Sequence, residues 1–258
     1  MIESSSSLQT TTFQTTRLRF AVWLLAGGVG LLIAFGFGLG LIALINSDGA
    51  MNPFTHLFFL PFGTTVYGLS GLLIARRYPS NPVGWFLLVV GIFAGVTLLS
   101  GAYTRFAGYD LSNPVGKLLD IFTWLDRWAW VVPSFVPLTL VLLYFPNGYL
   151  LSARWRWLVW LAGFGMIGVM IGAALYPAPL PDFGLMEHNP YGIPGAEALL
   201  RTVLNLSGFA LLLGLLGSFA SVIVRYRRSS GTERTQLKWL LYAAGLVLTA
   251  LLMLALAW

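Results

Sequence analysis

The stretch Val83-Gly-Trp-Phe-Leu-Leu-Val-Val-Gly-Ile-Phe-Ala-Gly-Val-Thr-Leu-Leu-Ser-Gly-Ala-Tyr103 decides the fold class, because it holds no charged side chain. The hydrocarbon core of a bilayer is about 30 Å thick, and about 20 apolar residues in a helix cross it. Lipid offers no partner to backbone polar groups, so such a run forms a helix unless strands close into a barrel. The alternation typical of barrel strands is absent. The stretch therefore predicts a transmembrane helix.

Six further runs resemble this one, and Lys238 is the one charged residue that they contain. They are residues 20–45, 57–75, 128–145, 157–175, 203–224 and 237–258. We therefore predict an all-α, polytopic membrane bundle with seven transmembrane helices in residues 20–258, after a disordered cytoplasmic tail at 1–19. With 57% hydrophobic and 9% charged residues, against about 25% charged residues in soluble domains, the composition excludes a soluble globule.

The basic residues predict the orientation, because loops rich in Lys and Arg stay in the cytoplasm. Eleven of the fifteen fall before the first run, in alternate connectors or, in the case of Lys238, at the start of the last run: Arg17, Arg19, Arg76, Arg77, Arg154, Arg156, Arg225, Arg227, Arg228, Arg234 and Lys238. We place these in the cytoplasm, with the N-terminus, and seven runs then put the C-terminus at the outer face of the plasma membrane. Attraction to anionic lipids explains the basic face, so we expect membrane lipids and no nucleic acid as partners.

Two features of the outer side and the fourth run are candidates for function. Pro133 and Pro137 remove backbone donors and predict a kink, which is either a gate or a fixed shape. The polar residues of the two long outer connectors are candidate ligand contacts, with an ordinary solvated loop as the alternative: Asp120, Asp126, Arg127, Asp182, Glu187 and His188. Apolar spacing over residues 115–125 predicts a short helix on the outer interface.

Catalytic groups are absent from the predicted spans. The two histidines, His56 and His188, both fall in outer connectors, and the chain has no cysteine. Neither a zinc-protease motif nor a phosphate-binding loop occurs, and proton-coupled transport normally uses ionisable groups inside the spans. We therefore expect no enzyme activity, no cofactor and no metal site.

Four segments resemble the membrane-embedded input region of bacterial two-component sensor histidine kinases. The strongest is Arg227-Arg-Ser-Ser-Gly-Thr-Glu-Arg-Thr-Gln-Leu-Lys-Trp239. Residues 76–85 match the family pattern Arg-Arg-x-Pro-x-Asn-Pro-x-Gly-Trp, and 189–193 match Asn-Pro-x-Gly-Ile. Residues 145–151 match Phe-Pro-Asp-Gly-Arg-Leu-Pro with Asn147, Tyr149 and Leu151 in place of Asp, Arg and Pro.

This resemblance implies a sensory module of a histidine kinase, acting as a homodimer or with the helices of a partner kinase. The inner basic segment would then couple the spans to the anionic leaflet through Arg225, Arg227, Arg228, Arg234 and Lys238. Because the chain lacks a cytoplasmic phosphoacceptor histidine and an ATP-binding domain, we expect a kinase fragment, or less readily a stand-alone module. Two alternatives stay open: a small-solute or lipid transporter that uses the bent fourth span, and an accessory protein that binds partner helices.

Overall fold

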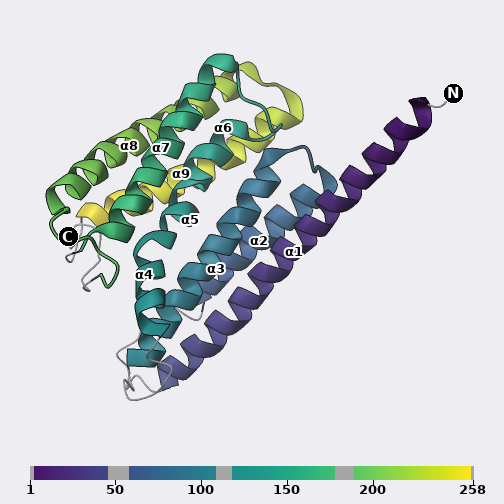
Figure 1. Ribbon diagram of the computed structural model, residues 1–258. Coiled ribbons are helices and arrows are strands. Elements are labelled where there is room, and N and C mark those ends of the chain that lie inside the picture. Colours follow the sequence, from purple (N-terminus) through teal and green to yellow (C-terminus); the bar gives the residue numbers. More distant parts are fainter. Residues whose placement is uncertain (1–2, 46–57, 109–117, 178–188, 257–258) are drawn as a thin grey trace.

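The computed structural model describes the backbone of residues 3–45, 58–108, 118–177 and 189–256 (Figure 1). All regular structure in these ranges is helical, which confirms the all-α class. Five helices are long and apolar enough to cross a membrane: Leu18–Ile45, Pro82–Phe106, Leu119–Tyr144, Ala153–Leu175 and Glu197–Arg228. They correspond to five of the seven expected spans.

The other two expected spans are also helices. α2 (Leu60–Arg77) has 18 residues and ends in two arginines, which lowers its hydropathy over its whole length. α9 (Gly231–Leu256) has 26 residues, and its side chains beyond residue 243 lie outside the described part. A seven-span bundle therefore remains a prediction, whereas an all-helical protein with five candidate spans is observed.

α1 (Glu3–Ile45) begins inside the segment that we expected to be a disordered tail. Residues 3–26 contain neither glycine nor proline, so no helix-breaking residue separates the Ser/Thr-rich segment from the apolar run. In Figure 1 the N-terminal part of α1 extends beyond the rest of the bundle. The prediction of disorder for residues 1–19 therefore differs from the structure in the described part, residues 3–19, which is helical.

α1, α2 and α3 (Pro82–Gly108) form one group of packed helices. Glycine permits the close approach of α2 and α3: a Cβ on Gly84 would lie 2.5 Å from the backbone nitrogen of Ala75, and one on Gly71 would lie 2.6 Å from that of Leu88. Val22 of α1 is buried against Ala75 and Leu88. The three helices are therefore held by tight contacts between backbones as well as between side chains.

The fourth predicted span is an interrupted helix. It consists of α4 (Leu119–Ala129), α5 (Val131–Phe135), the π-helical segment η3 (Pro137–Val141) and α6 (Leu142–Tyr144). Pro133 and Pro137 lack an N–H group, and the N–H of Val141 donates to the carbonyl of Val136 at 3.0 Å, five residues back. Insertion of a π-turn beside prolines is a recognised cause of helix distortion.

The expectation of a separate interfacial helix near residues 115–125 was wrong. α4 belongs instead to the candidate span Leu119–Tyr144. The apolar spacing was read correctly as helical, but α4 packs against α3 and α7, with Arg127 and Ala129 buried. Charged residues at positions 120, 126 and 127 made the segment look too polar to enter the bundle.

α7 (Arg156–Leu175), preceded by the 3-10 turn η4 (Ala153–Trp155), packs along α8 (Glu197–Arg228). A Cβ on Gly165 would lie 2.7 Å from the backbone nitrogen of Leu211. Gly168 and Gly172, which have the four-residue spacing that allows close helix packing, face Ser207 and Leu204 of α8. α5 joins the two groups of helices, because Val131, Val132 and Val136 share one core cluster with residues of α3, α7 and α8.

The outer surface of the helices also carries large exposed apolar side chains. Trp160 is 77% exposed, Phe62 is 69% exposed and Leu199 is 67% exposed, an arrangement that water would disfavour and lipid would solvate. We name the two ends of the bundle by a buried arginine at each. The Arg225 end holds the connectors 78–81, 145–152 and 229–230, and the Arg127 end holds the start of α4, the end of α7 and residues 189–196.

Candidate functional site

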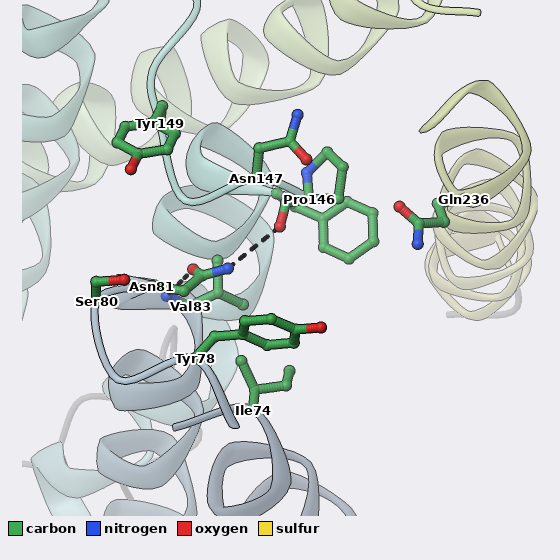
Figure 2. Close-up of a pocket in the computed structure, with 10 residues that line it drawn as sticks. Ile74, Tyr78, Ser80, Asn81, Val83, Pro146, Asn147, Tyr149 and Gln236 are labelled. Atoms are coloured by element: carbon green, nitrogen blue, oxygen red, sulfur yellow. Dashed lines mark hydrogen bonds between the residues drawn. The ribbon is translucent and has the colours of Figure 1, made fainter. Parts of the chain in front are cut away.

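A cavity of about 460 Å³ opens at the Arg225 end (Figure 2). Three segments that carry the family resemblance contribute to it: the α2–α3 connector, the 145–149 connector and the first turns of α9. The lining residues are Ile74, Tyr78, Ser80, Asn81, Val83, Phe145, Pro146, Asn147, Tyr149 and Gln236. Hydroxyl and amide groups line it together with apolar side chains, so its chemistry is that of neutral hydrogen bonding.

Asn81 organises one wall of this cavity. Its Oδ1 accepts a hydrogen bond from the N–H of Val83 at 3.0 Å, which caps the start of α3. Its Nδ2 donates to the carbonyl of Pro146 in the facing connector at 3.3 Å, and Figure 2 shows this bond crossing from one wall to the other. Pro82 at the first helical position has no N–H group to satisfy. The Asn-Pro pair thus begins α3 and joins two connectors.

The facing connector requires glycine at position 148. Gly148 has a φ of 80°, and a Cβ there would lie 2.8 Å from Oδ1 of Asn81. The N–H of Gly148 donates to the carbonyl of Tyr144 at 2.7 Å, which ends α6. The Phe-Pro-Asn-Gly segment is therefore a compact turn fitted against Asn81.

Arg225 binds the same connector from the side of α8. It is only 7% exposed, and its Nη2 donates to the carbonyls of Leu143 at 3.1 Å and Tyr149 at 2.8 Å. Glu233 of α9 attracts the guanidinium electrostatically, and its carboxylate accepts from Nδ2 of Asn147 at 3.2 Å. The end of the interrupted helix is thus bound to both α8 and α9.

The predicted basic coupling segment therefore divides into two parts. Arg225 is buried and bonded to backbone carbonyls, so it does not face the headgroups as we expected. Arg227 and Arg228 are exposed at the end of α8. Past the turn at Gly231, two cations stack on tyrosine rings: Arg234 lies 5.1 Å from the ring centre of Tyr226, and Lys238 lies 5.6 Å from that of Tyr242.

At the opposite end, Arg127 is 2% exposed and lies inside the bundle. Its Nε donates to the carbonyl of Ala173 at 3.3 Å, and its Nη2 lies 3.5 Å from that of Tyr176. Trp124 adds a bond from Nε1 to the carbonyl of Ala174 at 2.9 Å. The last carbonyls of a helix have no partner within the helix. Side chains of α4 therefore cap the end of α7.

Asn189 completes this cap with the same geometry that Asn81 uses at the other end. Its Oδ1 accepts from the N–H of Tyr191 at 3.0 Å. Its Nδ2 donates to the carbonyls of Ala174 at 2.7 Å and Tyr176 at 3.0 Å. Two of the Asn-Pro-x-Gly motifs thus join a local turn to a distant backbone segment. A third copy of the motif, residues 113–116, lies outside the described residues.

The other predicted outer contacts lie on α4 or outside the described residues. Asp120 is exposed in the first turn of α4. Asp126 lies beside Gly101 together with Arg105: a Cβ on that glycine would be 3.7 Å from Oδ1 of Asp126 and 3.0 Å from Nη1 of Arg105. Asp182, Glu187 and His188 lie outside the described residues. Among the residues described, no three potential metal ligands gather.

The interruption of the fourth span borders a second cavity, of about 410 Å³, between α2, α3, α5 and η3. Both Pro133 and Pro137 line it, together with Ser134, Thr64 and Tyr67. The predicted kink residues therefore lie beside open space within the candidate membrane region.

The burial of Arg127 and Arg225 was not predicted from the sequence. The predicted spans begin one residue after Arg127 and end one residue before Arg225, so both arginines were assigned to connectors. The segments of Asn81 and Asn189 were used only for the family resemblance, although the Asn-Pro-x-Gly motif that they share was a usable signal. An arginine inside a span is expected to have a specific partner, and here those partners are backbone carbonyls. No protein-family model matches the chain, and no curated protein or solved structure matches it significantly.

Proposed function

We propose that this chain is a membrane-embedded signal-input module, of the kind found in bacterial sensor histidine kinases. In this proposal the bundle has seven spans, and its Arg225 end faces the cytoplasm. A change at the Arg127 end alters the interrupted helix, and the 145–149 connector passes that change to α8 and α9. α8 ends and α9 begins at the same end of the bundle as this connector. A cytoplasmic partner or domain would receive the signal there.

One observation carries the proposal. The interrupted helix is held at each end by a buried arginine that bonds backbone carbonyls: Arg127 joins it to the end of α7, and Arg225 joins it to α8. Between these anchors lie two prolines and a π-helical segment. Signal transmission needs an element with two arrangements of similar free energy. A distorted helix between two fixed ends is a physical candidate for such an element.

The orientation can be tested separately, because the chain contains no cysteine. We expect a single cysteine at Ser230, which is exposed between α8 and α9, to react with a membrane-impermeant maleimide only after the cells are opened. Reaction in intact cells would place the Arg225 end outside and overturn the proposed direction of signalling.

Coupling between the ends can be measured with two spin labels in the same background. Ser152→Cys and Ser230→Cys place labels on the two connectors of the Arg225 end, and both positions are exposed. Arg127→Gln perturbs the opposite end. We expect it to change the distance between the labels by about 2 Å or more, the scale of helix shifts in switching proteins, as read by pulsed electron paramagnetic resonance in nanodiscs.

Asp120→Asn is the matched control, because Asp120 lies on α4 but is exposed in its first turn. It should leave the distance distribution unchanged. An Arg127→Gln protein that folds normally and gives the wild-type distribution would show that the ends are not coupled, and the signalling proposal would then fail. A distribution that changes equally in both variants would point to a general effect on stability.

The cavity beside Pro133 and Pro137 favours a transporter as the second candidate. A transporter should move solutes or labelled lipids across liposomes that contain the purified chain, and filling the cavity with Ser134→Phe should slow that movement. An input module should give no flux above that of empty liposomes.

A further inference from the structure

A separate, smaller cavity of about 260 Å³ lies between α1 and α2. Arg19, Val22, Trp23 and Arg76 line it. Two positively charged side chains therefore face one small volume, and no acidic residue contributes to its lining. The pair comes from two helices that the sequence separates by more than fifty residues.

The cavity lies where the apolar parts of α1 and α2 end, which is the level expected for phospholipid phosphates if these helices cross a bilayer. The candidate span of α1 begins at Leu18, one residue before Arg19, and α2 ends at Arg77, one residue after Arg76. Both guanidinium groups are thus placed where apolar helices leave the hydrocarbon core. Trp23 is 53% exposed next to them, and tryptophan rings favour this interface.

The structure holds the lining in place before a ligand binds. Val22 is 1% exposed and packs in a cluster with Ala75 and Leu88, which fixes the floor of the cavity. Arg19 and Trp23 are four residues apart on α1 and share one face of that helix. The guanidinium carbon of Arg76 lies 5.5 Å from the ring centre of Trp23, which orients it towards α1.

We propose that this cavity binds the phosphate group of an anionic membrane phospholipid. The guanidinium of arginine forms paired hydrogen bonds with phosphate oxygens and keeps its charge at the interface. A phosphate from solution would meet the same two arginines, but exposed apolar side chains flank them: Phe20 is 66% exposed and Leu24 is 59% exposed. A lipid can contact these with its glycerol and acyl groups. This inference does not rest on the proposed signalling function.

The test is a titration of the full chain in detergent with phosphatidylglycerol, with bound lipid counted by native mass spectrometry. Each lining arginine would lose its direct hydrogen bonds to the phosphate, so Arg19→Gln and Arg76→Gln should each weaken binding of the first lipid about fivefold to tenfold. Arg77→Gln is the matched control, because Arg77 lies against Tyr78 and does not line the cavity. It should change the affinity less than twofold, and phosphatidylcholine should bind weakly to every variant.

Two results would overturn the proposal. Equal weakening by Arg77→Gln and Arg76→Gln would mean that general surface charge attracts the lipid. Displacement of phosphatidylglycerol by inorganic phosphate at millimolar concentration would mean that the site takes a soluble anion. If Arg19→Gln fails to fold, Arg19→Lys with Arg76→Lys keeps both charges, and this pair should retain binding where the Gln variants lose it.

Discussion

Replacing Arg225 by methionine tests the contact on which the signalling proposal most depends. The change removes hydrogen bonds to the carbonyls of Leu143 and Tyr149. Bonds from a charged donor contribute about 1.5–3 kcal/mol each. Because the variant also avoids burying a charge, and methionine fills part of the volume, we expect a net loss of about 2–3 kcal/mol in the free energy of unfolding.

Reversible unfolding in mixed micelles with a rising fraction of denaturing detergent measures this loss. Hydrogen exchange should locate it, because amides of residues 145–151 should exchange faster while those of α2 stay protected. Arg228→Met is the control: Arg228 is exposed at the same helix end, and its replacement should alter stability by less than about 0.5 kcal/mol. Equal losses in both variants, or an Arg225→Met protein with wild-type exchange in the connector, would refute this account of the buried arginine.

Further variants separate local from tertiary effects. Asn189→Ala removes two hydrogen bonds to the carbonyls of Ala174 and Tyr176, which Trp124 and Arg127 still contact, and should cost about 2 kcal/mol in the same unfolding assay. Asn81→Ala removes a single cross-connector bond of 3.3 Å and should cost about 1 kcal/mol. Gly84→Ala should destabilise by about 1–3 kcal/mol, because its Cβ would meet backbone atoms. Gly63→Ala, where a Cβ would meet nothing within 4 Å, should be neutral or slightly stabilising in thermal unfolding.

The helices could be predicted from the sequence because the backbone polar groups of an apolar run in lipid must form hydrogen bonds with one another. Their ends were harder to predict. The run beginning at Trp128 excluded α4, since Asp126 and Arg127 looked like loop residues. Arg127 is instead satisfied by carbonyls of α7, 46 and 49 residues away in the sequence. Backbone carbonyls carry no sequence signature, so a buried arginine of this kind looks like an exposed one.

Each described Asn-Pro-x-Gly motif also makes one hydrogen bond that the local sequence predicts and others that depend on the tertiary fold. The bond from the asparagine oxygen to the N–H two residues later follows from turn chemistry, and it is present at Asn81 and Asn189. The second bond of each asparagine depends on which segment folds next to it. Likewise, the cavity at the Arg225 end is built from residues that the motifs named, but only the fold brings Tyr78 and Gln236 to its wall.

The glycine contacts of the two helix pairs have a mechanical consequence. The backbones of α2 and α3 touch at Gly84, and those of α7 and α8 touch at Gly165. The two helices of each pair therefore have little room to slide past one another, and each pair should tilt as a rigid body. When the surrounding bilayer thins or stretches, helices adjust their tilt. Relative movement of the two rigid pairs would then be taken up by the segment between them, around Pro133 and Pro137. Under the signalling proposal, membrane tension would then be a stimulus that needs no dedicated ligand pocket.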